Sequence, residues 1–413
     1  MPRTLLPLLL TATLVAIIPA CGGPAAAPVL PPTVVPKSTV GLTDNPISDA
    51  EATEFSERFI AGLKSGNPSK LSEVLDLDTV ATRTMQGIEL SQDDFNEMRK
   101  RILGDLTNES GLSGQVASVL ARGGSYRQLQ VHEVDGHKRA LLRLLAPQSG
   151  VNYHDVVLNK SDDGKIRAVD VHVFLTGEML SETMKRILIP LAARKNPALL
   201  ERLTPREKSV SARMKEILRM MDAVSRNSFA EALGIFERLP TDVKTEKFVL
   251  LLRLRAAREP GYEDAYNQAI EDFRLHHPDD PCIALLSIDY HLNRNEFDRA
   301  LQSIEEVDKA VGSDPYLNVL RAMAADGRKQ PDEARQLLAA SVEADPEIRQ
   351  AWVALVTIDL RRKAFPEVLR SLKEMDRLFQ PMWPDLSDNP AYSEFLQSPQ
   401  YGEWMAYLKG KAR

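Results

Sequence analysis

Cysteine and aromatic residues are scarce in this chain of 413 residues, which has 2 cysteines and 6% aromatic residues. Two cysteines, Cys21 and Cys282, cannot form the disulfide framework on which small secreted folds depend. The chain also lacks the motifs of common enzymes: it has no phosphate-binding loop, no dinucleotide-binding glycine pattern, no H-E-x-x-H and no G-x-S-x-G. We therefore predict no catalytic residue, no metal site and no cofactor.

An excess of positive charge is missing as well. The 52 basic residues are outnumbered by 58 acidic residues, the formal net charge is −6, and no block of lysine and arginine is interleaved with aromatic side chains. Binding to nucleic acid requires a basic face that neutralises phosphates. The composition therefore argues against nucleic acid as a partner, and the length is typical of about two to three globular domains.

Residues 1–20 have the pattern of a secretory leader. Arg3 precedes the apolar run LLPLLLTATLVAII, which is too short to span a membrane comfortably. The motif IPAC, which ends at Cys21, resembles the lipobox of bacterial lipoproteins. That resemblance implies a lipidated Cys21 and attachment to a membrane of the cell envelope, facing the periplasm or the exterior; simple secretion is the alternative. Residues 21–47 are rich in proline and alanine, so we expect a semi-rigid tether there.

Helical periodicity followed by strand alternation predicts an α+β domain at residues 48–191. Capping patterns and apolar stripes predict three helices, at 48–66, 71–77 and 91–106. About four antiparallel strands should follow, because two alternating segments flank Asp135-Gly136 and two more flank the SDDG sequence. This order of elements resembles the cystatin-like cone fold shared by nuclear transport factor and ketosteroid isomerase. The resemblance implies that the helices cover one face of the sheet.

The last of these strands carries a candidate ligand site. Strict alternation predicts that Asp170 and His172 share one face with Ile166, Ala168 and Phe174, and that the other face holds Val169, Val171, Val173 and Leu175. A carboxylate beside an imidazole can act as a general base with its orienting partner, and cone folds often enclose a pocket. Metal binding and ordinary hydrogen-bonded sheet residues are the alternatives. Four of the seven histidines fall in this sheet without a metal-ligand motif, namely His132, His137, His154 and His172.

A second domain, at residues 204–380, consists of repeats. An apolar column recurs every 34 residues, at Ala232, Tyr266, Ala300, Ala334 and Val368. Each copy has helical periodicity, so we expect five helix pairs. A period of this length resembles that of the tetratricopeptide repeat. The resemblance implies an all-α superhelical solenoid, in which each pair packs against the next and leaves a concave groove.

The resemblance also implies which residues line the groove. Carried over position by position, the partner-binding residues are Phe248, Leu251, Arg255, Leu285, Asp289, Tyr316, Val319, Met323 and Val353. Such grooves bind extended or helical segments of other proteins. Residues 381–413 contain several aromatic residues and should cap the last repeat, either alone or while also occupying part of the groove.

Together these features predict an exported, lipid-anchored scaffold that binds protein partners in a bacterial envelope assembly. The alternative is a small-ligand binder or an enzyme that uses the α+β domain around Asp170 and His172. A purely structural envelope spacer is the third possibility, and it would fill its own groove.

Overall fold

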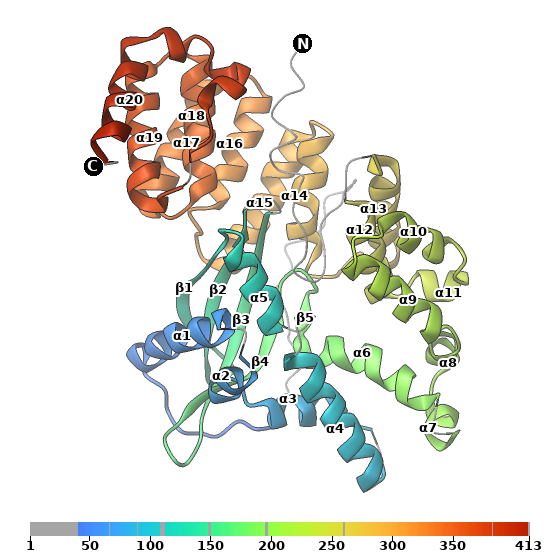
Figure 1. Ribbon diagram of the computed structural model, residues 1–413. Coiled ribbons are helices and arrows are strands. Elements are labelled where there is room, and N and C mark those ends of the chain that lie inside the picture. The colour runs from blue at the N-terminus through green and yellow to red at the C-terminus, as the bar shows by residue number, and fades with distance from the viewer. Residues whose placement is uncertain are drawn as a thin grey trace. The chain divides into compact units, whose positions relative to one another are not determined.

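The computed structural model of the protein describes residues 40–65, 67–88, 90–107, 112–147, 150–194, 197–258, 261–381 and 383–411. Within them, a five-stranded antiparallel sheet is preceded by helices and is followed by helices to the C-terminus (Figure 1). The expected order, an α+β part and then an all-α part, is therefore confirmed. The described residues group into two compact units, which divide between Tyr290 and His291.

Five helices precede the sheet in the described ranges, rather than the three predicted. They are α1 (Asp49–Lys64), α2 (Pro68–Val74), α3 (Leu77–Met85), α4 (Gln92–Thr107) and α5 (Leu112–Ala121). The predicted capping box begins α1, where the side chains of Ser48 and Glu51 each accept the other residue's backbone N–H. The helix predicted over 71–77 is divided, because Leu75 bridges to Ala168 of the sheet and Asp76 caps the next helix.

The sheet is an antiparallel meander in which the strands follow one another in chain order. Its strands are β1 (Ser125–Val134), β2 (His137–Ala146), β3 (Gly150–Lys160), β4 (Ile166–Val173) and the short β5 (Glu178–Met179). Asp135 and Gly136 join β1 to β2 with φ of 52° and 80°, the pair of left-handed residues that a two-residue type I′ turn requires. Both predicted hairpins are therefore present, and β5 adds a fifth strand.

A bulge at Val169 interrupts the pairing of β3 with β4. Val157 pairs with Asp170, whereas the next residue of β3, Leu158, pairs with Ala168. Val169 is consequently the extra residue of the bulge. Because side chains of a strand alternate between two faces, one extra residue reverses the faces of everything on its far side.

The bulge corrects the faces predicted for β4. Ile166 and Ala168 lie in the helix-covered core together with Val171, whereas Val169 packs in a small cluster on the opposite face. The prediction that Ile166 and Ala168 share a face with Asp170 is therefore wrong, since strict alternation does not hold through a bulge. Asp170 and His172 lie beyond the bulge and still share one face, as predicted.

The main core of the α+β part lies between the sheet and its helices. Phe55 and Phe59 of α1 are fully buried there against residues of β2 and β3. Helix α6 (Leu180–Ala193) connects this core to a second one, because Leu188 packs in the first core and Ile187 packs against the second. Two short helices follow, α7 (Pro197–Arg202) and α8 (Pro205–Ala212). The first unit therefore continues through the boundary that we predicted between the two domains.

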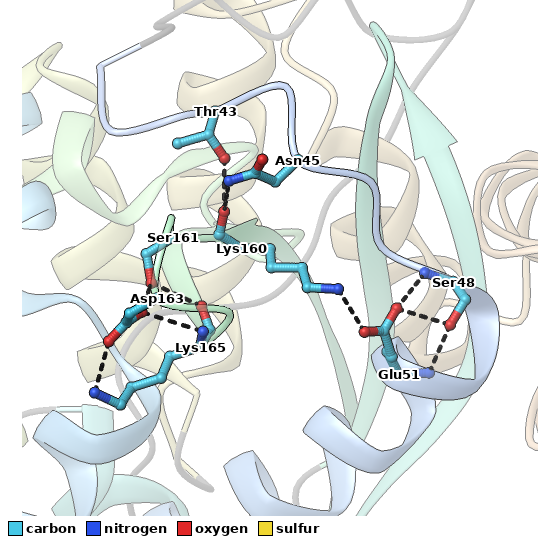
Figure 2. Close-up of polar contacts among 8 residues, drawn as sticks. All are labelled: Thr43, Asn45, Ser48, Glu51, Lys160, Ser161, Asp163 and Lys165. Atoms are coloured by element: carbon cyan, nitrogen blue, oxygen red, sulfur yellow. Dashed lines mark hydrogen bonds and ion pairs between the residues drawn. The ribbon is translucent and has the colours of Figure 1, made fainter.

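The end of the predicted tether lies against the sheet (Figure 2). The backbone N–H and the hydroxyl of Thr43 donate to Asn159 Oδ1 at 2.8 and 3.0 Å, and Asn45 donates to the carbonyl of Lys160 at 3.0 Å. Leu42 packs against the cluster that contains Val169. Residues 40–47 therefore belong to the fold of the first unit, although the sequence predicts them as tether.

Five helix pairs follow α8 with a repeating spacing. The second helices of the pairs are α10 (Phe229–Glu237), α13 (Glu263–His276), α15 (Phe297–Val311), α17 (Pro331–Ala344) and α19 (Phe365–Phe379), each of which begins 34 residues after the one before. The first helices are α9 (Met214–Ser225), α12 (Lys247–Ala257), α14 (Ile283–Asn293), α16 (Leu317–Gly327) and α18 (Arg349–Arg361), and a single-turn helix, α11 (Thr241–Lys244), precedes α12. The predicted period is therefore present in the secondary structure.

The turn inside each pair repeats in backbone conformation as well. A residue with positive φ lies two positions before each second helix, and these residues are Asn227, Gly261, Asn295, Lys329 and Lys363. In the first pair, Asn227 N donates to Val224 O at 3.1 Å and Ser228 N donates to Ala223 O at 2.8 Å. The same two hydrogen bonds recur after α14, α16 and α18. They form the Schellman pattern, in which a left-handed residue ends a helix and satisfies its last carbonyl groups.

The C-terminal segment covers the last helix pair. It comprises three short 3-10 helices, η2 (Leu386–Asp388), η3 (Pro390–Tyr392) and η4 (Phe395–Gln397), and then α20 (Pro399–Lys411). Phe395 and Trp404 are fully buried in a core that they share with α18 and α19. Asp376 of α19 accepts hydrogen bonds from Trp383 Nε1 at 3.0 Å, from the Tyr407 hydroxyl at 2.9 Å and from Lys411. The segment thus occupies the position in which a cap is expected.

Within the first unit, the turn before β5 joins the sheet to the helix pairs. A Cβ added at Gly177 would lie 2.5 Å from Asp280 Oδ1 and 3.0 Å from the backbone nitrogen of Cys282. Beside this contact, Lys247 of α12 is buried and lies 2.5 Å from Asp280 and 3.8 Å from Glu178 of β5. We call this group of residues the junction, and it sets how the sheet sits against α12 and the start of α14.

We expect Gly177→Ala to destabilise the first unit more than Gly136→Ala does. Both glycines have positive φ, which costs an alanine about 1–2 kcal/mol. Only at Gly177 would the new methyl group meet a neighbouring segment, and such overpacking costs about 1–3 kcal/mol more. Urea unfolding followed by circular dichroism measures both losses. Tryptophan fluorescence serves as an internal reference, because all three tryptophans lie in the second unit. Equal losses would contradict the close contact at the junction.

Candidate functional site

Asp170 forms a buried ion pair where α3 and α6 pack against β4. Its Oδ2 accepts a hydrogen bond from the Ser181 hydroxyl at 2.5 Å, and its Oδ1 accepts one from the Ser181 N–H at 3.2 Å. Arg83 Nη1 lies 3.5 Å from Oδ2, and the Arg83 and Asp170 side chains are at most 3% exposed. Burial raises the pKa of Asp170, although the bonds from Ser181 and the charge of Arg83 act in the opposite direction. The contacts described for Asp170 are therefore all to other groups of the protein.

His172 makes no hydrogen bond or ion pair with Asp170 among the described contacts. Its ring packs edge-on against Phe174, with 5.3 Å between the ring centroids, and it lies opposite Asp155 of β3. Burial lowers the pKa of His172 to about 4, so the ring is neutral near pH 7. Its Nε2 is buried without a hydrogen-bond partner in the described part of the chain. The two candidate ligand residues therefore share a face, as predicted, but each contacts a different set of neighbours.

A different histidine–carboxylate pair lies on the same face of the sheet. His132 Nε2 of β1 lies 2.7 Å from Asp155 Oδ1 of β3, and Arg139 Nη1 of β2 donates to Asp155 Oδ2 at 3.0 Å. Burial by itself would raise the pKa of Asp155, but the hydrogen bonds and charges of His132 and Arg139 lower it overall. Sequence reasoning missed this group, because it depends on the register of three strands joined by two turns.

The chemistry open to this triplet is restricted by Arg139. A carboxylate can orient a histidine as a general base when a substrate reaches the second nitrogen of the ring. Here both oxygens of Asp155 are occupied, one by Arg139 and one by His132, and the His132 side chain is 32% exposed. We therefore assign the triplet to holding β1, β2 and β3 together.

The helix-covered face holds a second buried histidine, His154. Asn152 Oδ1 accepts two backbone N–H groups, from Tyr153 and Leu175, so Asn152 Nδ2 must be the donor in its 3.0 Å contact with His154 Nε2. His154 Nδ1 then carries the proton and donates to the Tyr126 hydroxyl at 2.9 Å. Burial and the nearby His172 lower the pKa of His154 to about 4. This network satisfies polar groups inside the core and leaves none of the His154 nitrogens for a substrate.

In the first unit, most of the predicted groove residues are buried. All residues of α12 are buried, and Phe248 and Leu251 belong to the helical core of that unit. Arg255 is also buried, and its guanidinium lies 5.1 Å from the centroid of the Phe229 ring. Leu285 of α14 is buried, whereas Asp289 is 37% exposed and pairs with Arg258. These positions, apart from Asp289, present little surface to a partner, because the tightly packed first unit surrounds α12.

In the second unit, exposure of the predicted groove residues increases along the chain. Tyr316 and Val319 of the fourth pair are buried, and Met323 is half-buried. Val353 on α18 is 36% exposed, and it is one of the few large apolar side chains exposed in the described ranges. Thr357, one helical turn further on, donates its hydroxyl to the Val353 carbonyl. The face of α18 that carries Val353 is therefore accessible.

Three further predictions concern lipid, metal and membrane. Cys21 and the leader lie outside the described residues. In the ranges that the structure describes, no group of three or more His, Cys, Asp or Glu side chains is arranged to hold a metal ion. No helix of those ranges combines the length and the apolar composition that crossing a bilayer requires.

Comparisons with protein-family models, with curated proteins and with solved structures give no match to the chain. The arguments below therefore rest on the residues and contacts of this protein alone.

Acid is expected to destabilise the first unit through His154 and His172. Their pKa is about 4 in the folded protein, against an ordinary value of 6.5, so the unfolded chain binds more protons between these values. The stability that the two neutral rings contribute is complete above pH 6.5. It is lost as the pH falls toward 4, by about 1.4 kcal/mol per pH unit for each ring. Urea unfolding by circular dichroism across this range measures the slope.

His154→Gln should remove about one proton from that slope. His137→Gln is the matched control, because His137 lies at the β1–β2 turn with a half-buried side chain and should leave the slope unchanged. The same slope in His154→Gln as in the unaltered protein would contradict a buried, neutral His154.

Asp170→Asn should show whether Asp170 is structural. The substitution leaves the Arg83 charge buried without an ionic partner, so we expect a loss of about 3 kcal/mol or more in the free energy of unfolding. Asp163→Asn is the control, since Asp163 pairs with Lys165 in the exposed turn between β3 and β4 and should change stability little (Figure 2). Unchanged stability in Asp170→Asn would instead favour a ligand-binding or catalytic role for Asp170.

Proposed function

We propose that the protein is a lipid-anchored scaffold of the bacterial cell envelope that binds partner proteins through tetratricopeptide-like repeats. In this proposal the leader is removed, Cys21 carries lipid, and the segment rich in proline and alanine is the tether. The α+β part is a cystatin-like cone and the helix pairs form a solenoid. The binding surface is the face of the first helices, and the site residues in the second unit are Met323 and Val353.

One observation carries the proposal, namely that the turn inside the helix pairs repeats every 34 residues. A repeated hydrophobic pattern can arise in any long amphipathic helical region. A repeated left-handed residue is more specific, because lysine and asparagine adopt positive φ only where the surrounding structure demands it. Five such residues at one spacing support a tandem array of equivalent helix hairpins. Arrays of this kind form extended surfaces, and binding other proteins is their usual role.

A recurring ion pair supports the equivalence of the later copies. Arg328 pairs with Asp298, and Arg362 pairs with Asp332. Both members of the second pair lie 34 residues after those of the first. Exposed pairs of this kind contribute little to stability, so their value here is that the same geometry occurs twice.

The accessible part of the predicted groove suggests the chemistry of the partner segment. Val353 is apolar and exposed, Thr357 follows on the same helical face, and Met323 is half-buried and flexible. Methionine side chains adapt to partners of different shape. We therefore propose that the partner contributes an amphipathic helix or an extended segment with apolar side chains.

Photo-crosslinking in intact cells tests the proposal. A benzophenone amino acid at Val353 should form an adduct with the same foreign protein in repeated experiments. Leu275 is the matched control, because it is 72% exposed but lies on a second helix, α13. Thr357→Arg should remove the adduct, since it places a charge one helical turn from Val353. Tryptophan fluorescence should confirm that the second unit of this variant remains folded.

Two outcomes would contradict the proposal. The same adduct at Val353 and Leu275 would show collision without a specific surface. Adducts at Val353 only to residues 381–413 of the same chain would favour the structural spacer.

A further inference from the structure

A pocket lies at one end of the sheet, away from the groove and from the buried ion pairs. It encloses about 220 Å³ between the segment 43–47 and the ends of β1, β2 and β3. At about 30 Å³ for each water in the liquid, this volume holds about seven waters. It therefore suits a molecule of the size of a mid-sized amino acid and is too small for a nucleotide.

One wall of the pocket offers hydrogen-bond donors. Asn159 is 9% exposed, and its Oδ1 is used by Thr43, but its Nδ2 has no partner among the described residues. Lys160 donates one of its three ammonium hydrogens to Glu51 at 2.6 Å, and its side chain can be followed to that contact in Figure 2. A buried amide nitrogen without a partner is costly, so the wall is suited to a ligand that brings an acceptor, such as a carboxylate.

Another part of the lining offers acceptors. Asp44 has no hydrogen-bond or ion-pair partner in the described part of the chain, and Glu133 lies 3.7 Å from Lys138. Both carboxylates are exposed. Two carboxylates alone would not define a site. Together with the donors of Asn159 and Lys160 they give the lining groups of both signs, which matches a ligand that carries both a cation and an anion.

The remaining lining excludes other ligands of similar size. Pro46, Ile47 and Leu158 supply an apolar part, and no aromatic side chain lines the pocket. Sugars and nucleobases usually stack on aromatic rings, so they are disfavoured. The two lysines are already paired with carboxylates of α1, so a phosphate would find no free cationic cluster.

We propose that this pocket binds a small α-amino acid with an apolar side chain. The carboxylate of the ligand accepts from Asn159 and Lys160, its ammonium group donates to Asp44 and Glu133, and its side chain packs against the apolar part of the lining. This site is independent of partner binding through the repeats. It gives the α+β part a sensory role at the point where the chain from the anchor enters the fold.

Thermal unfolding of the full chain with L-leucine tests the site. Leucine should raise the unfolding midpoint of the first unit, followed by circular dichroism, because a ligand that binds only the folded state stabilises it. It should leave the tryptophan fluorescence transition of the second unit unchanged. Equal shifts of both units would reveal general exclusion of a cosolute from the protein surface, and would overturn the proposal. N-acetyl-leucine lacks the ammonium group and leucinamide lacks the carboxylate, so both should shift the midpoint much less.

The variant Glu133→Gln should weaken leucine binding about ten- to hundredfold, because one charge-assisted hydrogen bond is lost. Glu54→Gln is the matched control, since Glu54 is an exposed residue of α1 outside the lining. Glu133 is exposed, so its variant should fold and any loss can be assigned to binding. The absence of a shift with leucine, or the same shift in both variants, would overturn the proposal.

Discussion

The first unit depends on the junction, where a turn with no side chain meets a buried ion pair. Gly177 lets the turn before β5 approach the loop that leads into α14, and Lys247 is buried between Asp280 and Glu178. A lysine in such a place is stable only while its carboxylate partners remain in position. This contact positions the sheet, α12 and the start of α14 together. As a result, α12 is buried along its whole length.

The same physical rule separates the buried polar groups from the plausible sites. Asp170 and Asp155 are each surrounded by donors of the protein, and His154 is held between an amide and a hydroxyl. Groups that are fully satisfied in this way stabilise one arrangement of strands and helices, and they have little capacity left for a ligand. The pocket at the sheet end differs, because Asn159 Nδ2 and Asp44 have hydrogen-bonding capacity that no described residue uses.

The helix pairs achieve regularity through their turns more than through their side chains. The residues that adopt positive φ differ from copy to copy, yet each lies at the same place between two helices. The Schellman hydrogen bonds explain this, because they need a left-handed residue and leave its side chain free to vary. At the C-terminal end, Phe395 and Trp404 cover the last pair, and Asp376 gathers three donors around it. An exposed terminal repeat would otherwise leave apolar surface in water.

Periodicity and capping signals, read from the sequence alone, determined the class of each part, both hairpins, the start of α1 and the spacing of the helix pairs. These features are local, since each depends on residues a few positions apart. Tertiary structure decided the rest. The bulge at Val169 reversed a face, the register of three strands brought His132 to Asp155, and the docking of Thr43 on Asn159 made a pocket wall from predicted tether. Each of these contacts joins segments that are adjacent only after folding, and no local pattern in the sequence encodes them.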